Sequence, residues 1–223
     1  MSKYPRRAGA IVRRFRRMAL LVVALNASAC STGEQDDSAT LPAGEEPAAG
    51  ELVAPVVAIV LGNEIRSTVP DVVSEEILTR LFGRYRDDNG LEAGDAEVDA
   101  FVADMQEKMA DDPNFTANDN LAPAERAQAD EMRRQMARSM ITRWKVNRAM
   151  YREYGGRVIG QQLGPEPLDA YRQFLEAQES AGNFVINDPA MEQSFWRYFR
   201  DDSMHSFLDP EEADAVFAEP PWE

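Results

Sequence analysis

Apolar residues recur at spacings of three and four along most of the chain after residue 70, which is the period of one face of an α-helix. Asp-Pro pairs precede two of these stretches, and such pairs favour helix starts because Asp caps a helix and Pro suits its first position. The sequence therefore predicts a mainly α protein. Its helices are expected over about 70–87, 95–110, 123–153 and 166–181, with a fifth from Asp188-Pro189 and a short sixth from Asp209-Pro210.

Two short segments have the pattern of strands instead of helices. Residues 56–61 form a continuous apolar run, Gly62-Asn63 offers a turn, and residues 64–68 provide a return strand. Residues 157–162 fit another short strand, after Gly155-Gly156 has ended the long helix. We therefore predict a short N-terminal β-hairpin ahead of the first helix.

The predicted helix over 123–153 combines an apolar row with an excess of positive charge. Met132, Met136, Met140 and Trp144 follow one another at intervals of four residues. Such a row is most often the buried stripe of a helix. It also suits a groove for apolar polypeptide segments, because methionine adapts its shape and is common at surfaces that bind many partners. These four residues are our candidate client-binding residues, and the basic side chains are expected to pair with the acidic helices.

The first thirty residues have the order of a secretory signal. Seven Arg and Lys precede an apolar stretch from Met18 to Leu25, and Ala27-Ser28-Ala29-Cys30 follows. The apolar stretch is shorter than the roughly twenty residues that a membrane-spanning helix needs. The ending resembles a bacterial lipobox, which implies a signal peptide over 1–29 and acylation of Cys30, the only cysteine. Because Ser31 follows Cys30, the resemblance implies a periplasmic lipoprotein, anchored in the inner leaflet of the outer membrane.

Residues 30–51 differ in composition from the rest of the chain, and the net charge of the chain limits the kinds of partner that it can bind. Residues 30–51 are rich in Ala, Gly, Ser, Pro and acidic residues, which predicts a disordered acidic tether behind the lipidated cysteine. Without residues 1–29 the chain keeps 17 basic and 39 acidic residues, a net charge of −22. This charge excludes nucleic-acid binding through the overall field, and it leaves the acyl chains as the expected contact with the membrane.

A resemblance to a known family emerges over residues 56–109. The run Val-Val-Ala-Ile-Val-Leu-Gly-Asn-Glu-Ile at 56–65 is similar to the strand, turn and Ile that open SurA-type periplasmic chaperones. Residues 90–99 resemble the connection between their first two helices, with Gly94 in place of the usual Ser or Thr cap. The resemblance implies a SurA-N-like helical domain over 52–153, followed by a C-terminal helical extension over 154–223 that packs on it.

Few residues offer catalytic or metal chemistry, and we predict neither an enzyme nor a cofactor. SurA-type proteins that isomerise prolyl bonds carry a parvulin domain of about ninety residues, whereas fewer than seventy residues follow Gly156 here. His205 is the only histidine, and no nucleophile is set beside it on a strand-turn-helix elbow. The acidic pairs lack the spacing of a calcium loop, so no metal site is expected. The aromatic residues near the C-terminus are expected to close a small core.

Two functions fit these observations. The first is a lipid-anchored, non-catalytic module that holds unfolded or extended segments of envelope proteins. The second is an immunity or inhibitor lipoprotein that neutralises a single basic periplasmic toxin or hydrolase, because a strongly acidic protein is steered toward a cationic partner. A module of the first kind binds many unfolded chains weakly, whereas an inhibitor binds one folded partner tightly. Neither function implies a small-molecule substrate.

Overall fold

A computed structural model describes residues 54–111, 121–161, 164–220 and 222. These residues all belong to one compact unit, which spans Ala54–Glu223. The predicted signal peptide, the predicted lipidation site Cys30 and the predicted tether lie outside the described residues.

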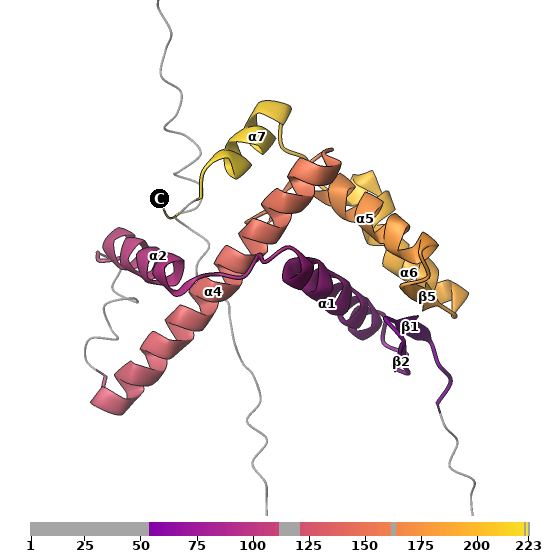
Figure 1. Ribbon diagram of the computed structural model, residues 1–223, viewed down its shortest axis with the longest axis horizontal. Helices are drawn as coiled ribbons and strands as arrows, with labels where there is room; N and C mark the ends of the chain where they lie inside the picture. The colour runs from indigo at the N-terminus through magenta and orange to yellow at the C-terminus, as the bar shows by residue number, and fades with distance from the viewer. Residues whose placement is uncertain (1–53, 112–120, 162–163, 221, 223) are drawn as a thin grey trace, which may run out of the picture. The chain divides into compact units, whose positions relative to one another are not determined.

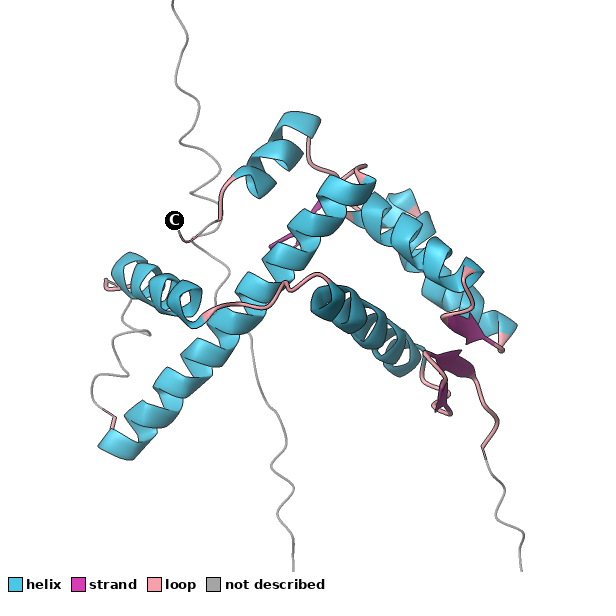
Figure 2. Cartoon of the chain, in the orientation of Figure 1, coloured by secondary structure: helices cyan, strands magenta, loops and turns pink. Residues whose placement is uncertain are grey.

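Most described residues are helical, which confirms the prediction of a mainly α protein (Figures 1 and 2). The fourth predicted helix begins two residues later than expected, because residues before it pair as a strand. The observed helices are α1 Pro70–Asp88, α2 Asp95–Lys108, α4 Pro123–Tyr154, α5 Leu168–Ser180, α6 Pro189–Arg200 and α7 Pro210–Ala218, with a short 3-10 turn at Asp202–Met204.

The predicted N-terminal hairpin is present, and a third strand joins it from far along the chain. β1 Ala58–Val60 pairs antiparallel with β2 Asn63–Ile65 and, on its other side, with β5 Phe184–Ile186. The sheet order is β2-β1-β5, so the hairpin strand β1 is central. The prediction had no strand at 184–186, although turn residues bound this apolar run on both sides.

A second pair of strands follows the long helix. β3 Ile159–Gln161 pairs antiparallel with β4 Gly164–Glu166, and Ile159 also forms an isolated bridge with Phe207. The strand predicted over 157–162 is therefore confirmed, in a shorter form. β4 leads directly into α5, and it brings Glu166 and Asp169 close to the C-terminal half of α4.

Buried residues form two hydrophobic clusters, and α4 contributes to both. The larger cluster joins the three-stranded sheet, α1, α5 and α6, and receives Val146 and Met150 from α4. The smaller one places α2 and α7 against Ala137, Ile141 and Trp144 of α4. The C-terminal aromatic residues divide between them: Phe195, Trp196 and Phe199 lie in the larger cluster, and Phe217 and Trp222 lie in the smaller one.

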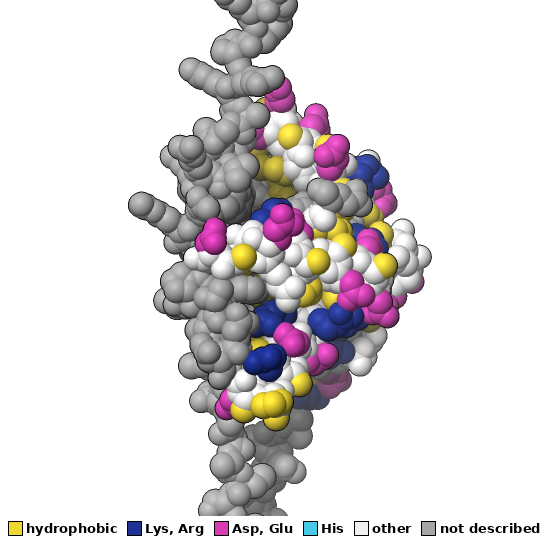
Figure 3. Space-filling view, turned by 90° about the vertical axis from the view of Figure 1, so that its left-hand side faces the viewer, with side chains coloured by type: hydrophobic (Ala, Val, Ile, Leu, Met, Phe, Trp, Pro, Cys, Tyr) yellow, Lys and Arg dark blue, Asp and Glu magenta, His cyan; other side chains and the backbone are white. Residues whose placement is uncertain are grey.

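Ion pairs between α4 and its neighbours account for much of its positive charge, as the sequence predicts. Arg134, Arg138 and Lys145 contact carboxylates of α2, and Arg143 contacts one on β4. Figure 3 shows acidic and basic side chains intermingled with hydrophobic ones on the face that it presents. Exposed pairs of this kind each stabilise the fold by less than about 1 kcal/mol.

Within the part of the chain that the structure describes, no helix has the length and the apolar composition that crossing a membrane requires.

Candidate functional site

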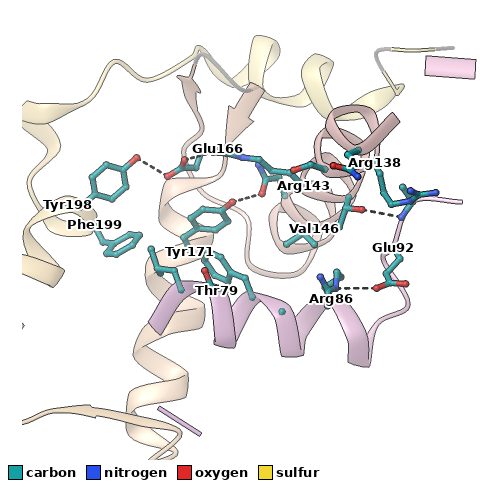
Figure 4. Close-up of a pocket in the computed structure, with 18 residues that line it drawn as sticks. Thr79, Arg86, Glu92, Arg138, Arg143, Val146, Glu166, Tyr171, Tyr198 and Phe199 are labelled. Atoms are coloured by element: carbon teal, nitrogen blue, oxygen red, sulfur yellow. Dashed lines mark hydrogen bonds and ion pairs between the residues drawn. The ribbon is translucent and has the colours of Figure 1, made fainter. Parts of the chain in front are cut away.

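A groove of about 840 Å³ lies beside the C-terminal half of α1, and α4 forms its opposite wall (Figure 4). Residues of β4, α5 and α6 close its inner end. The groove therefore lies where the larger hydrophobic cluster reaches the surface of α4, and both long helices contribute side chains to it.

The α1 wall of the groove is mainly apolar. Leu78 and Phe82 are four residues apart and only partly buried, because they stand beside the buried stripe of α1 and not within it. The Phe82 ring packs on Tyr171 of α5 with 4.6 Å between ring centroids. Gly83 leaves the wall open, since a Cβ built there meets no atom within 4 Å.

The inner end of the groove holds a buried carboxylate. The side chain of Glu166 is only 8% exposed and accepts hydrogen bonds from Tyr198 Oη at 2.9 Å and Arg143 Nη2 at 3.2 Å. Burial raises the pKa of this carboxyl, because desolvation outweighs the hydrogen bond from Tyr198 and the charge of Arg143, which both lower it. Both oxygens already have donors, so Glu166 acts here as an acceptor that positions Tyr198 and Arg143.

Further hydrogen bonds fix the polar floor around Glu166. The Tyr171 hydroxyl donates to Asn147 Oδ1, and Asn147 Nδ2 donates to the carbonyl of Pro165 at 2.7 Å. His205 Nε2 lies 2.7 Å from the carbonyl oxygen of Tyr198, and its ring meets the Tyr198 ring edge to face. The single histidine is therefore held by the backbone of α6. Sequence reasoning missed this network, because its members come from α4, β4, α5 and α6 and from His205, which follows the 3-10 turn.

The α4 wall carries cations at the rim of the groove. Arg138 and Arg143 both line it, and Arg86 lies across from them on α1 (Figure 4). Arg138 Nη2 is 2.6 Å from Asp95 Oδ1, whose side chain is 80% exposed. Arg86 Nε is 3.7 Å from Glu92 Oε1. Three arginines and two carboxylates, Glu92 and Glu166, thus line the groove, and the carboxylates of Asp95 and Asp87, which do not line it, also pair with Arg138 and Arg86.

The predicted methionine row does not form one surface. Met132 and Met136 are exposed at 63% and 46%, Met140 is half-buried, and Trp144 is buried at 7% in the smaller cluster. The reason is geometric: four residues turn a helix by about 40° beyond a full circle, so the row drifts by about 120° over three steps. Met132 and Met136 lie one helical turn from the groove residues Gln135 and Ser139, whereas Trp144 faces α7.

A second buried carboxylate, Asp169 of α5, binds Arg157, which follows the end of α4. Arg157 donates to Asp169 Oδ2 from its backbone nitrogen and from Nε, each at 2.8 Å, and Arg172 lies 3.3 Å from Oδ1. These donors, led by the Arg157 side chain, lower the pKa of Asp169. Gly156, with φ of +93°, allows the approach, because a Cβ there would lie 2.4 Å from the Asp169 Cβ. Tyr154-Gly155-Gly156-Arg157 is thus a helix end tied to α5.

The described residues hold no cluster of three or more His, Cys, Asp or Glu side chains placed to bind a metal ion. Comparisons with protein-family models, with curated proteins and with solved structures give no match for this chain. The groove between α1 and α4 is the candidate functional site of the described residues.

Proposed function

We propose that the chain is a non-catalytic binding module that holds extended polypeptide segments against α4, and that acylated Cys30 anchors it on the periplasmic side of a membrane. One observation carries the binding part: the groove has apolar side chains in Leu78, Phe82 and Val146, and exposed Met132 and Met136 lie on α4 one helical turn from its lining residues Gln135 and Ser139. The fourteen residue steps from Met132 to Val146 span about 21 Å of helix. A peptide of six or seven residues in extended conformation has the same length.

Three features support a polypeptide ligand. Leu78 and Phe82 offer apolar contacts without closing the groove, and Met132 and Met136 offer adaptable contacts past its end. Thr79, Ser139 and Thr142 add hydroxyl groups that can bond to a peptide backbone. The resemblance of residues 56–109 to SurA-type chaperones implies the same class of ligand. Trp144 is left out of the proposed surface because it is buried.

The test is suppression of aggregation by residues 31–223, a fragment that contains the whole compact unit and omits Cys30. The client is an unfolded outer-membrane barrel protein. Met136→Asp should reduce protection, and Met204→Asp should not, because Met204 is exposed to a similar degree, 51%, but belongs to the 3-10 turn after α6 and not to α4. Both variants should stay folded, because exposed positions tolerate substitution with changes of about 0.5 kcal/mol.

A second pair of variants tests the groove itself. Gly83→Leu places a side chain in open space within the groove, whereas Glu75→Leu places the same side chain on an exposed part of α1. Protection should fall only with Gly83→Leu. No protection by the unmodified fragment would refute the proposal and would favour a dedicated inhibitor, for which capture of one folded basic partner at low salt is the direct measurement.

A further inference from the structure

We infer that the groove selects polypeptide segments that present a carboxylate next to apolar side chains, with Arg138 and Arg143 as the recognising groups. This inference rests on the proposed function and narrows its ligand class. The two arginines are five residues apart on α4, which places them about 140° apart around the helix. They therefore flank the strip of α4 that faces the groove, and a segment lying on that strip passes between two guanidinium groups.

Both arginines keep donors for a second carboxylate. A guanidinium has five N–H donors in a fork that matches a carboxylate. Arg143 donates from Nη2 to Glu166 and is 36% exposed, while Arg138 donates from Nη2 to Asp95 and is 44% exposed. The Asp95 pair is open to solvent, so a ligand carboxylate displaces it at little cost.

The surroundings of the two arginines favour an anionic group that belongs to an apolar segment. Leu78, Phe82 and Val146 provide apolar contacts within the same groove, and removal of water from these contacts strengthens a charge-assisted hydrogen bond nearby. Glu166 is turned inward to Tyr198, and its side chain is nearly inaccessible, so it does not occupy the space between the arginines. Each of the two arginines has one carboxylate partner, so both remain partly exposed cations on a chain that is acidic as a whole.

The experiment measures binding of three fluorescent seven-residue peptides that share one apolar sequence, using residues 31–223 and fluorescence anisotropy. The first peptide has a free C-terminal carboxylate, the second a C-terminal amide, and the third an amide with Asp beside an apolar residue. Either carboxylate peptide should bind at least about fivefold more tightly than the plain amide, and the advantage should shrink at high salt. Preference for the first identifies a chain terminus, and preference for the third identifies an acidic side chain.

Variants tie the preference to the two arginines. Arg143→Gln should remove most of the affinity advantage of the carboxylate peptides, although it also takes a donor from buried Glu166. Arg138→Gln should reduce the same advantage without that complication, because its partner Asp95 is exposed. Arg152→Gln is the matched control, since Arg152 is exposed on α4 and does not line the groove. Equal affinity for all three peptides, with binding lost in Gly83→Leu, would overturn this inference and leave the proposed function standing. No binding of any peptide would overturn both.

Discussion

Glu166 and Asp169 are two buried carboxylates three residues apart, and their surroundings differ in kind. Asp169 collects a backbone N–H and the side chains of Arg157 and Arg172, so its ionised form is stabilised and its pKa is lowered. Glu166 borders the groove with fewer donors, and burial raises its pKa. Burial alone therefore does not define a carboxylate's role. Asp169 joins the end of α4 to α5, whereas Glu166 lies beside a groove that is open to solvent.

The largest effect on stability is expected at Gly156, the residue against which the Asp169 side chain packs. Gly156→Ala combines a positive φ of +93° with a Cβ only 2.4 Å from the Asp169 Cβ, so backbone strain adds to disruption of the network. We expect a loss of about 3 kcal/mol in the free energy of unfolding, measured by urea denaturation. Gly90→Ala, also at positive φ but with nothing within 4 Å, should lose only about 1 kcal/mol. Equal losses would show that the close approach to Asp169 carries no weight.

Removal of the Asp169 carboxylate should have the second largest effect on the free energy of unfolding. Asp169→Ala leaves the backbone N–H of Arg157 without its acceptor, and we expect a loss of about 2 kcal/mol near neutral pH. Because the folded pKa of Asp169 is lowered, its contribution is present above the unfolded value of about 3.9 and is lost as pH falls through the folded pKa. Denaturation curves of the two proteins should therefore converge in acid. A difference that stays constant down to low pH would contradict an ionic role.

Glu166→Gln should have the opposite pH dependence. A raised folded pKa means that the folded protein binds more protons than the unfolded chain above about pH 4.3, so Glu166 reduces stability as pH rises through that window. Near neutral pH the variant should differ from the parent by less than about 1 kcal/mol, because Gln keeps an acceptor for Tyr198. Its stability relative to the parent should increase between pH 4 and pH 7. A decrease over that range would mean that Arg143 and Tyr198 outweigh desolvation.

The smallest effect on stability is expected at Gly83, which has free space beside it, in contrast to Gly156, which is close to Asp169. Gly83→Ala adds a Cβ beside the open groove within helix α1, where it meets no neighbour. Replacement of a mid-helix Gly by Ala should stabilise the fold by about 0.5–1 kcal/mol. Thermal unfolding provides the measurement, and a destabilised Gly83→Ala would show that the space beside α1 is needed for packing.

Much of the fold follows from local patterns in the sequence, and the site does not. The periodic apolar residues and the Asp-Pro pairs place all six described helices within a few residues, because spacing and capping are local properties. The row from Met132 to Trp144 is also local, but which members are exposed depends on where α2 and α7 pack. The approach of Glu166 to Tyr198 and of Asp169 to Arg157 depends on the pairing of β3 with β4, which no periodicity in the sequence specifies.

The pairing of β1 with β5 means that the three-stranded sheet cannot form until two distant parts of the chain meet. Ile59 pairs with Val185, 126 positions later, and the sheet is complete only when these distant segments meet. Contacts between residues so far apart carry a high loop-closure entropy and are typical of slow folding. During synthesis the apolar residues of β1 consequently stay without their second partner until residues 184–186 have been made. If the proposed function holds, a module that binds extended segments of other proteins would itself present an unpaired apolar strand while it folds.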